Sequence, residues 1–283
     1  MPSTDGSAPR GRQMTHDGPG THLRRHGAAP YRTAVLHGGP GATGDAAPLA
    51  RRLSRLGGVL EPLQRAPSVN GQIEELAACL REAAALPATL IGHSWGAWLG
   101  ILLAGRHPQL VAKLVLIGCP PLEERYAAAI LETRLARLTP PQRGEALALL
   151  QGAEEGMDRL GRLFDRTDSY DPLPAGEDDA GDPPCVFSPT IHARVWPQAA
   201  ALRKSGELLR VARSLTCPVI ALHGDHDPHP AAGVFAPLAG LAGLRCIVLP
   251  RCGHTPWRER QACELFFRTL AAVLDEAAPP SAG

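Results

Sequence analysis

The stretch TLIGHSWGAWLGILLA, residues 89–104, joins a strand-like apolar run to a helix-like apolar run through a turn with glycines on both sides of one serine. A nucleophile at the carboxyl end of a parallel strand must project above the sheet, and a sharp strand-to-helix turn achieves this. Side chains two residues before and after the serine would collide with neighbouring backbone, and Gly92 and Gly96 avoid that collision. The turn therefore predicts Ser94 as a nucleophile. The alternative interpretation is a serine that caps the following helix.

Strand-like and helix-like runs alternate on both sides of this turn. Short apolar runs bounded by Gly or Pro predict strands at residues 32–39, 58–63, 88–92, 112–118, 217–224 and 244–250. Longer runs with helical spacing or helix-capping residues predict helices at residues 45–57, 68–86, 95–108, 230–243 and 255–278. This alternation predicts the α/β class, with a mostly parallel sheet that helices cover on both faces.

The chain length and a break in the alternation indicate one domain with an insertion. At 283 residues the chain suits one large domain that can hold an inserted subdomain. From about residue 120 to 210, helix-like runs, prolines and an acidic Pro/Gly-rich segment replace the alternation. We predict a core of residues 29–119 and 211–283 and a helical cap of residues 120–210. Residues 1–28, rich in Gly, Pro, Ser and Arg, predict a disordered tail.

The overall composition argues against several classes of partner. The 44% hydrophobic and 20% charged residues predict a packed globule, and the net charge of +1 gives no electrostatic reason to expect nucleic acid or a membrane as partner. No apolar run of 18 residues and no signal peptide is apparent. The seven cysteines are scattered and odd in number, which predicts reduced thiols. We expect a cytoplasmic protein that needs no cofactor and no metal, and the sequence does not predict its oligomeric state.

A second glycine-rich turn, LHGGPGA at residues 36–42, follows the first predicted strand of the core. Acyl transfer needs two N–H donors directed at the oxyanion of a tetrahedral intermediate. The residue after the nucleophile, Trp95, supplies one donor in this interpretation, and Gly39 is the best candidate for the other. A phosphate-binding loop is excluded because no Gly-Lys-Ser/Thr sequence follows.

A histidine base and an orienting carboxylate are expected after the nucleophile, in the order Ser, Asp, His. The segment LHGDHDPHP, residues 222–230, ends a late strand and offers Asp227, with Asp225 as the alternative. Asp227 is favoured because it lies farther beyond the strand and Pro228 stiffens the turn after it. His254, which follows the last predicted strand, is the expected base.

Two competing chemistries have weaker support in the same segments. The cluster of His223, His226, Asp227 and His229 lacks the i, i+4 spacing of a helical zinc motif, and no later ligand is apparent. Cys252 lies close to His254 in sequence but has no nucleophile turn of its own, which argues against a cysteine nucleophile.

The motifs HGGPGA, GHSWGA, HGDHDP and CGHTPW, in this order at the ends of predicted strands, resemble those of the α/β-hydrolase superfamily. The HGGPG turn together with Ser-Trp-Gly is most similar to the proline iminopeptidase branch, although His93 stands where that branch usually has glycine. The resemblance covers residues 32–118 and 216 to about 277. It implies an α/β-hydrolase fold with Ser94 as nucleophile, Asp227 as acid, His254 as base, and Gly39 and Trp95 at the oxyanion.

The sequence thus predicts a serine hydrolase acting on a small molecule or short peptide, with release of an N-terminal proline or small residue as one activity and ester or thioester cleavage as the alternative. A non-catalytic receptor for a small ligand on the same fold is the hypothesis from another class. The expected pocket residues are Trp98, Tyr126, Phe164 and Trp196. A substrate ammonium would need cap carboxylates, and the candidates are Glu123, Glu124, Glu132, Glu154, Glu155 and the loop from Glu177 to Asp182.

Overall fold

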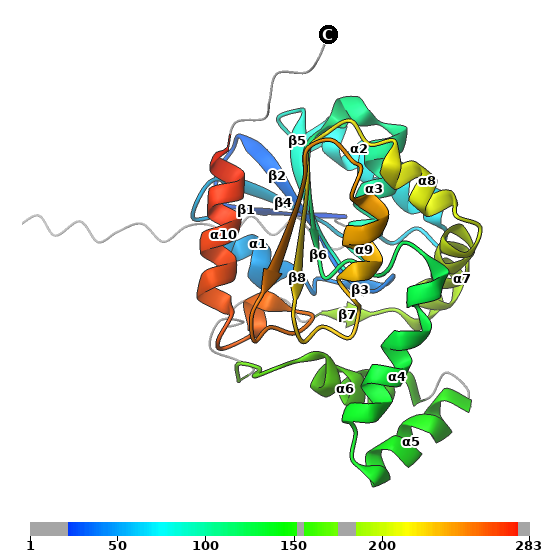
Figure 1. Cartoon of the computed structure of the whole chain (residues 1–283). Coiled ribbons are helices and arrows are strands. Elements are labelled where there is room, and N and C mark those ends of the chain that lie inside the picture. Colours follow the sequence, from blue (N-terminus) through cyan, green and yellow to red (C-terminus); the bar gives the residue numbers. More distant parts are fainter. Residues whose placement is uncertain (1–21, 152–155, 175–184, 277–283) are drawn as a thin grey trace, which may run out of the picture.

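The computed structural model describes residues 22–151, 156–174 and 185–276. A seven-stranded sheet forms its centre, in the order β1-β4-β2-β5-β6-β8-β9 (Figure 1). All neighbouring strands are parallel except β1, which pairs antiparallel with β4. The predicted, mostly parallel sheet is therefore confirmed. Its strands are β1 Leu23–His26, β2 Tyr31–Leu36, β4 Gly58–Pro62, β5 Ala88–His93, β6 Val111–Ile117, β8 Val219–Gly224 and β9 Leu244–Leu249.

Helices cover both faces of this sheet (Figure 1). One face carries α1 and α10, and the other carries α2, α3, α8 and α9. The helices are α1 Ala47–Leu53, α2 Val69–Ala83, α3 Trp95–Arg106, α8 Glu207–Arg213, α9 Ala232–Leu238 and α10 Cys263–Asp275.

The central strands alternate their side chains between the two helical layers. In β5, Leu90 packs into the layer of α2 and α3, whereas its neighbour Ile91 packs into the layer of α1 and α10. Both side chains are fully buried, because a parallel sheet with helices on both sides leaves no face to water. Because β2, β5 and β8 are parallel, their carboxyl ends all lie at the same end of the sheet.

The inserted helices lie beyond the carboxyl ends of these strands (Figure 1). Helices α4 Ala128–Arg137, α5 Pro140–Gln151 and α6 Met157–Asp168 pack on one another through a small apolar cluster of Leu138, Ala146, Leu160 and Leu163. Helix α7, Pro189–Lys204, leads back toward the core and is not ended by Pro197.

The predicted boundary of the cap at residue 210 falls inside α8 and does not match the packing. Leu208 and Ala212 of this helix are buried in the core layer that also holds α3. Val195 and Ala199 of α7 join the same layer. The separate cap layer therefore consists of α4 to α6, while α7 and α8 pack against the core.

The predicted disordered tail is wrong for its last residues, because Leu23–His26 form β1. This strand pairs with β4, and its side chains are held by the fully buried carboxylate of Glu61. His26 Nε2 lies 2.8 Å from Glu61 Oε2, and Arg24 Nη1 lies 3.4 Å from Oε1. Polar pairing across strands thus compensates for a sequence with little apolar character. Residues 1–21 of the expected tail lie outside the described residues.

A second, two-stranded sheet connects the cap segment to the glycine-rich turn. Strand β3, Ala42–Thr43, pairs antiparallel with β7, Val186–Phe187. Gly41 allows this approach, since a side-chain carbon there would lie 2.7 Å from the carbonyl oxygen of Ser188. Among the described helices, none has the length and apolarity to cross a lipid bilayer. All seven cysteines are free thiols.

Candidate active site

Ser94 occupies the strained turn between β5 and α3. Its backbone has φ 51° and ψ −116°, a left-handed conformation that is uncommon for a residue other than glycine. A side-chain carbon at Gly92 would lie 2.3 Å from the carbonyl oxygen of Gly96, and one at Gly96 would lie 2.5 Å from that of Leu36. The turn is therefore possible only with glycine at both positions. Ser94 makes no side-chain capping bond to α3, so the capping interpretation does not fit.

The two proposed oxyanion donors lie beside this serine. Trp95 is the first residue of α3, where backbone N–H groups have no partner within the helix. The glycine-rich turn comes close to the nucleophile, since a side-chain carbon at Gly38 would lie 3.4 Å from Cβ of Ser94. Gly39 has φ 40° and lines the same cavity as Ser94 and Trp95. The loop that carries Gly39 and the start of α3 thus both border the cavity beside Ser94.

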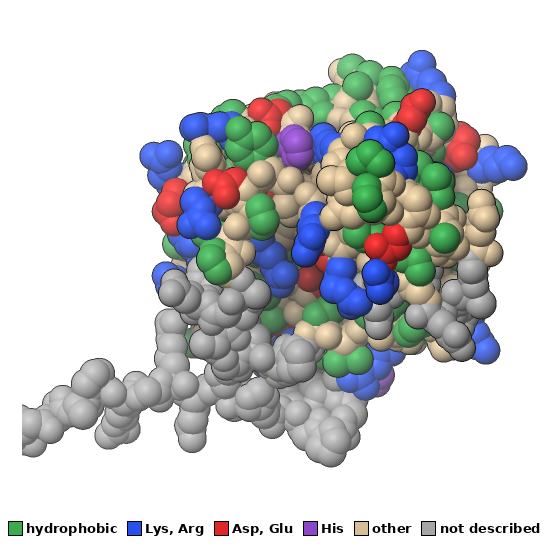
Figure 2. Space-filling view, turned by 90° about the horizontal axis from the view of Figure 1, so that it is seen from below, with side chains coloured by type: hydrophobic (Ala, Val, Ile, Leu, Met, Phe, Trp, Pro, Cys, Tyr) green, Lys and Arg blue, Asp and Glu red, His purple; other side chains and the backbone are tan. Residues whose placement is uncertain are grey.

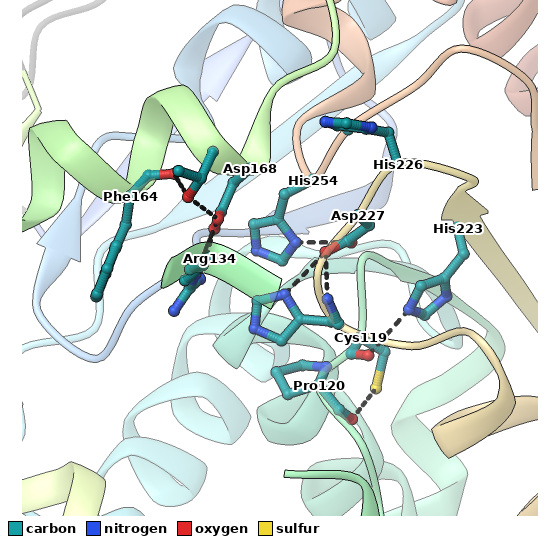
Figure 3. Close-up of polar contacts among 12 residues, drawn as sticks. Cys119, Pro120, Arg134, Phe164, Asp168, His223, His226, Asp227 and His254 are labelled. Carbon is teal, nitrogen blue, oxygen red and sulfur yellow. Dashed lines mark hydrogen bonds and ion pairs between the residues drawn. The ribbon is translucent and has the colours of Figure 1, made fainter. Parts of the chain in front are cut away.

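Asp227, rather than Asp225, contacts the expected base. His254 Nδ1 lies 2.8 Å from Oδ2 of Asp227, whose side chain is fully buried (Figure 3). Asp225 instead accepts the backbone N–H of Cys252 at 3.1 Å. The carboxylate of Asp225 therefore fastens the loop that carries His254, and only Asp227 is in position to orient the imidazole.

The loop carrying His254 is also tied to the cap. The backbone N–H of His254 donates to the carbonyl oxygen of Asp168, at the end of α6, at 2.8 Å. The buried carboxylate of Glu259 accepts three backbone N–H groups, from Gly253 on this loop and from Tyr170 and Asp171 after α6. A buried charge held by three donors is a stable anchor. The position of His254 thus depends on both the core and the cap.

The other histidines of the late loop have separate contacts. His223 is buried, and its Nε2 lies 3.1 Å from the carbonyl oxygen of Cys119 (Figure 3). His226 packs edge-on against Tyr170. His229 contacts Asp227 directly, a hydrogen bond that was not predicted from the sequence. Burial raises the pKa of Cys252 above its usual value, so that thiol is not an activated nucleophile.

Asp227, His229 and His254 are close enough to hold a metal ion, since their ligand atoms lie within 4.8 Å of one another. Within this trio, however, each Nδ1 already lies at direct hydrogen-bonding distance from a different oxygen of Asp227. His223 and His226, the other members of the cluster considered from the sequence, make the separate contacts described above. The geometry fits a hydrogen-bonded trio better than a coordination site.

Ser94 and His254 open onto one cavity of about 1000 Å³ between the core and the cap. This volume lies at the upper end of the range for small-molecule sites. The predicted pocket residues Phe164 and Trp196 line it, but Trp98 and Tyr126 do not. Trp98 is 1% exposed and donates its indole N–H to the carbonyl oxygen of Pro120. The apolar lining that the sequence did not indicate comes from Ile130, Leu131, Leu150, Leu160, Leu173 and Phe187.

Arginines dominate the charged lining of this cavity. On the face that includes the cap, Lys and Arg side chains surround a hollow (Figure 2). Eight arginines and three aspartates line the cavity, and its lining within the described part of the chain includes no glutamate or lysine. The arginines are Arg51, Arg52, Arg55, Arg134, Arg162, Arg166, Arg203 and Arg258. Such a lining favours a neutral or anionic ligand over a cation.

The cap glutamates expected to bind an amine are placed elsewhere. Glu123 pairs with Arg125, Glu124 pairs with Arg203, and Glu132 is exposed. None of these three lines the cavity. Glu154, Glu155 and the loop from Glu177 to Asp182 lie outside the described residues.

The carboxylates that do line the cavity are Asp45, Asp165 and Asp168. Arg134 binds Asp168 through two nitrogens, with Nε 2.8 Å from Oδ1 (Figure 3). The side chain of Asp165 is exposed to solvent, although the surrounding protein partly desolvates it. This desolvation, together with the charges of Asp168 and Asp45, raises the pKa of Asp165. Asp165 is thus the described cap carboxylate in the best position to meet a ligand.

The activity should increase with pH through one step. Burial alone would lower the pKa of His254, but the charge and hydrogen bond of Asp227 outweigh burial and place it above the usual 6.5. Burial lowers the pKa of His93, His223 and His229, so His254 is the histidine of this group that loses a proton above pH 6.5. Because a general base must be neutral, kcat/KM should rise with pH through that step, as a pH–rate profile would show.

The same profile recorded after dialysis against EDTA provides the control for metal chemistry. We expect it to overlay the untreated profile, because a hydrogen-bonded base needs no ion. A profile that falls with increasing pH, or activity lost in EDTA and restored by zinc, would contradict this assignment.

The chain is similar to known proteins over most of its length. A model described as "Alpha/beta hydrolase family" matches residues 21–268. The solved structure of VinJ is 22% identical, covers 95% of this chain and 99% of its own, and superposes with a TM-score of 0.68. Proline iminopeptidase of Mycobacterium smegmatis is 17% identical, with 89% and 93% coverage and a TM-score of 0.60. The enol-lactonase of Burkholderia xenovorans is 20% identical, with 90% and 96% coverage and a TM-score of 0.58. No curated protein matches. At these identities the structures show a shared fold.

Proposed function

The chain belongs to the alpha/beta hydrolase family, and from this premise we propose that it is a serine hydrolase that works through an acyl-enzyme. Ser94 is the nucleophile, His254 the general base, and Asp227 the carboxylate that orients the base. The N–H groups of Trp95 and Gly39 form the oxyanion hole. The observation that carries the proposal is that Ser94, in its strained turn, and the Asp227-bound His254 line one cavity.

The proposed chemistry follows from which nitrogen of His254 is occupied. Its Nδ1 is taken by Asp227, which leaves Nε2 to accept the proton of the Ser94 hydroxyl as the oxygen attacks the acyl carbon. The tetrahedral intermediate collapses when His254 returns that proton to the leaving group. A water then attacks the acyl-enzyme and His254 takes one of its protons. The second tetrahedral intermediate collapses as His254 passes that proton to the departing Ser94 oxygen, which releases the acid product and restores the serine hydroxyl.

The charged lining supports a neutral or anionic acyl ester or thioester as the substrate. An ammonium group entering this cavity would meet more arginines than carboxylates, and Arg134 already occupies the carboxylate of Asp168. An ester carries no charge next to the scissile bond and needs only the triad and the oxyanion donors. The apolar wall that includes Ile130, Leu160 and Phe164 suits an acyl chain.

One observation favours a second candidate, release of an N-terminal proline or small residue. Asp165 lines the cavity and makes no ion pair within the described residues, and Asp45 also faces the cavity. A substrate ammonium close to the scissile carbonyl would require such a carboxylate, since an unpaired buried charge is costly. This activity is expected only if Asp165 binds the amine.

Two chromogenic substrates distinguish these candidates. We expect kcat/KM for p-nitrophenyl butyrate to exceed that for proline 4-nitroanilide by more than about tenfold, because a penalty of only about 1.4 kcal/mol on the ammonium produces that ratio. Asp165→Asn should leave ester hydrolysis within about twofold of wild type, since the ester has no ammonium to lose.

A strong preference for the prolyl anilide that Asp165→Asn abolishes would establish the amine site and contradict the ester proposal. Absence of any turnover and of labelling by a fluorophosphonate, a general probe of serine hydrolases, would favour the alternative of a non-catalytic receptor.

A further inference from the structure

His229 shares the carboxylate of Asp227 with His254. Its Nδ1 and its backbone N–H each lie 2.9 Å from Oδ1, while His254 Nδ1 lies 2.8 Å from Oδ2. The two imidazole rings are stacked, with centroids 4.3 Å apart and planes inclined by 25°. His254 projects toward Asp227 from the loop after β9 (Figure 3), and His229 contacts it from the loop after β8, which also carries Asp227. One buried carboxylate thus holds two imidazoles.

Packing alone does not require an imidazole at this position. The backbone N–H of His229 already gives Oδ1 of Asp227 a partner, and any flat ring could stack on His254. The side chain adds a second donor to the same oxygen. With both donors on Oδ1, the carboxylate cannot rotate without breaking two hydrogen bonds, and Oδ2 stays directed at His254. The imidazole of His229 therefore fixes the orientation of the group that orients the base.

The shared carboxylate also affects the basicity of His254. Hydrogen bonds to a carboxylate stabilise its charge and weaken its hold on any further proton or cation. Burial alone would raise the pKa of Asp227, but the two imidazoles hold it well below its usual value. Removing the side-chain donor, while the backbone N–H of His229 stays on Oδ1, would increase the share of the negative charge on Oδ2, which faces His254. The imidazolium of His254 would then be stabilised more strongly than in the wild type.

The protonation state of His229 follows from its surroundings. Burial and the neighbouring His254 lower its pKa, so it is neutral, with its proton on Nδ1 and the lone pair of Nε2 left for the cavity that it lines. The other charged or titratable groups of the described residues that interact with this trio include Arg134 and Arg137 on α4, Asp168 on α6, His93 at the end of β5 and His223 on β8. The thiols of Cys119 and Cys252 also lie close to Asp227.

We propose that His229 is a positioning residue of the triad: it holds Oδ1 of Asp227 so that Oδ2 stays directed at His254, and it sets the pH at which His254 becomes a base. The proposal rests on the proposed function, because His254 must be the base of Ser94. It assigns His229 no direct contact with the reacting atoms.

Two variants separate the hydrogen bond from the packing. His229→Phe keeps a stacked ring and the backbone N–H but loses the side-chain donor. His229→Asn keeps a donor at the position of Nδ1 but loses the ring. For His229→Phe we expect kcat to fall about tenfold with KM changed less than about twofold, and the acid limb of the pH profile to move up by about one unit. His229→Asn should keep the acid limb at its wild-type position.

The rates are divided by the fraction of protein molecules that a fluorophosphonate labels, so that misfolded protein is excluded from the kcat values. A second readout needs no turnover: an NMR titration of the His254 imidazole in wild type and His229→Phe should show the same upward shift. Unchanged titration and acid limb in His229→Phe would overturn the proposal, as would equal shifts in both variants. Activity that zinc restores after chelation would also overturn it. If the NMR titration of His254 shifts in His229→Phe but wild type shows no turnover of any substrate, the proposed function is wrong, while the effect of His229 on His254 is confirmed.

Discussion

Ser94→Ala is expected to lower turnover of an ester substrate by on the order of 10⁶, the loss found when a serine hydrolase loses its nucleophile. The oxygen removed is the atom that attacks the acyl carbon, so no other group in the cavity can replace it. The backbone N–H of residue 94 still donates to the carbonyl oxygen of Ile117 at 2.9 Å, and alanine adds no atom to the crowded turn. The midpoint of thermal unfolding should therefore change little.

Labelling provides the measurement that does not depend on the choice of substrate. A fluorophosphonate should modify wild type at Ser94, as mass spectrometry of the labelled peptide would show, and should leave Ser94→Ala unmodified. Ser169→Ala is the matched control, since Ser169 lines the same cavity and its hydroxyl donates to the carbonyl oxygen of Asp165. That variant should label normally. Labelling of Ser94→Ala at any other residue, or near-normal turnover, would remove Ser94 from its role.

The features that the sequence predicted well depend on short-range sterics. Gly92 and Gly96 indicate a tight turn because a side chain at either position collides with backbone a few residues away or on the adjacent strand. The parallel sheet was predictable for a similar reason, since strands such as β5 and β6 are buried on both faces and therefore read as continuous apolar runs.

Strand β1 shows what such patterns miss. Its sequence LRRH has one apolar residue, and its place in the sheet depends on Glu61, which lies 35 residues from His26 and is fully buried. No local pattern reveals that a distant buried carboxylate will pair with the strand.

The lining of the cavity was the least predictable part of the site. Trp98 is an apolar residue one turn into α3, but its position in the helix turns it into the core, where it stacks on Trp196. Asp165 faces the cavity because α6 packs on α4 and α5 through a cluster of its own. These orientations depend on how the cap helices lie on the core, and the sequence gives helix positions without that placement.

His229 did leave a signal in the sequence. In Asp227-Pro228-His229 the proline has no N–H, so the first donor after the carboxylate that can turn back to it is the backbone of His229. A side chain at that position is held against the same carboxylate. The sequence favoured Asp227 over Asp225 only by its position farther beyond β8 and by Pro228, since both aspartates follow β8 within three residues. The turn geometry decides between them by directing Asp225 to the backbone of Cys252.

Asp227→Asn should therefore reduce kcat by on the order of 10⁴, the loss expected when a triad histidine is held in the wrong tautomer. The carboxylate accepts the Nδ1 proton of His254 at 2.8 Å, which leaves Nε2 free to accept the proton of Ser94. An amide in its place also loses the charge that stabilises the imidazolium, and its NH₂ group can donate to Nδ1 and move the ring proton to Nε2. Asp225→Asn is the matched control, because an amide oxygen can still accept the N–H of Cys252 at 3.1 Å. That variant should keep kcat within about threefold of wild type.

Rates measured for both variants against p-nitrophenyl butyrate, with circular dichroism to verify folding, decide the assignment. If Asp225→Asn proves the more damaging of the two while both fold, the orienting carboxylate has been assigned to the wrong aspartate.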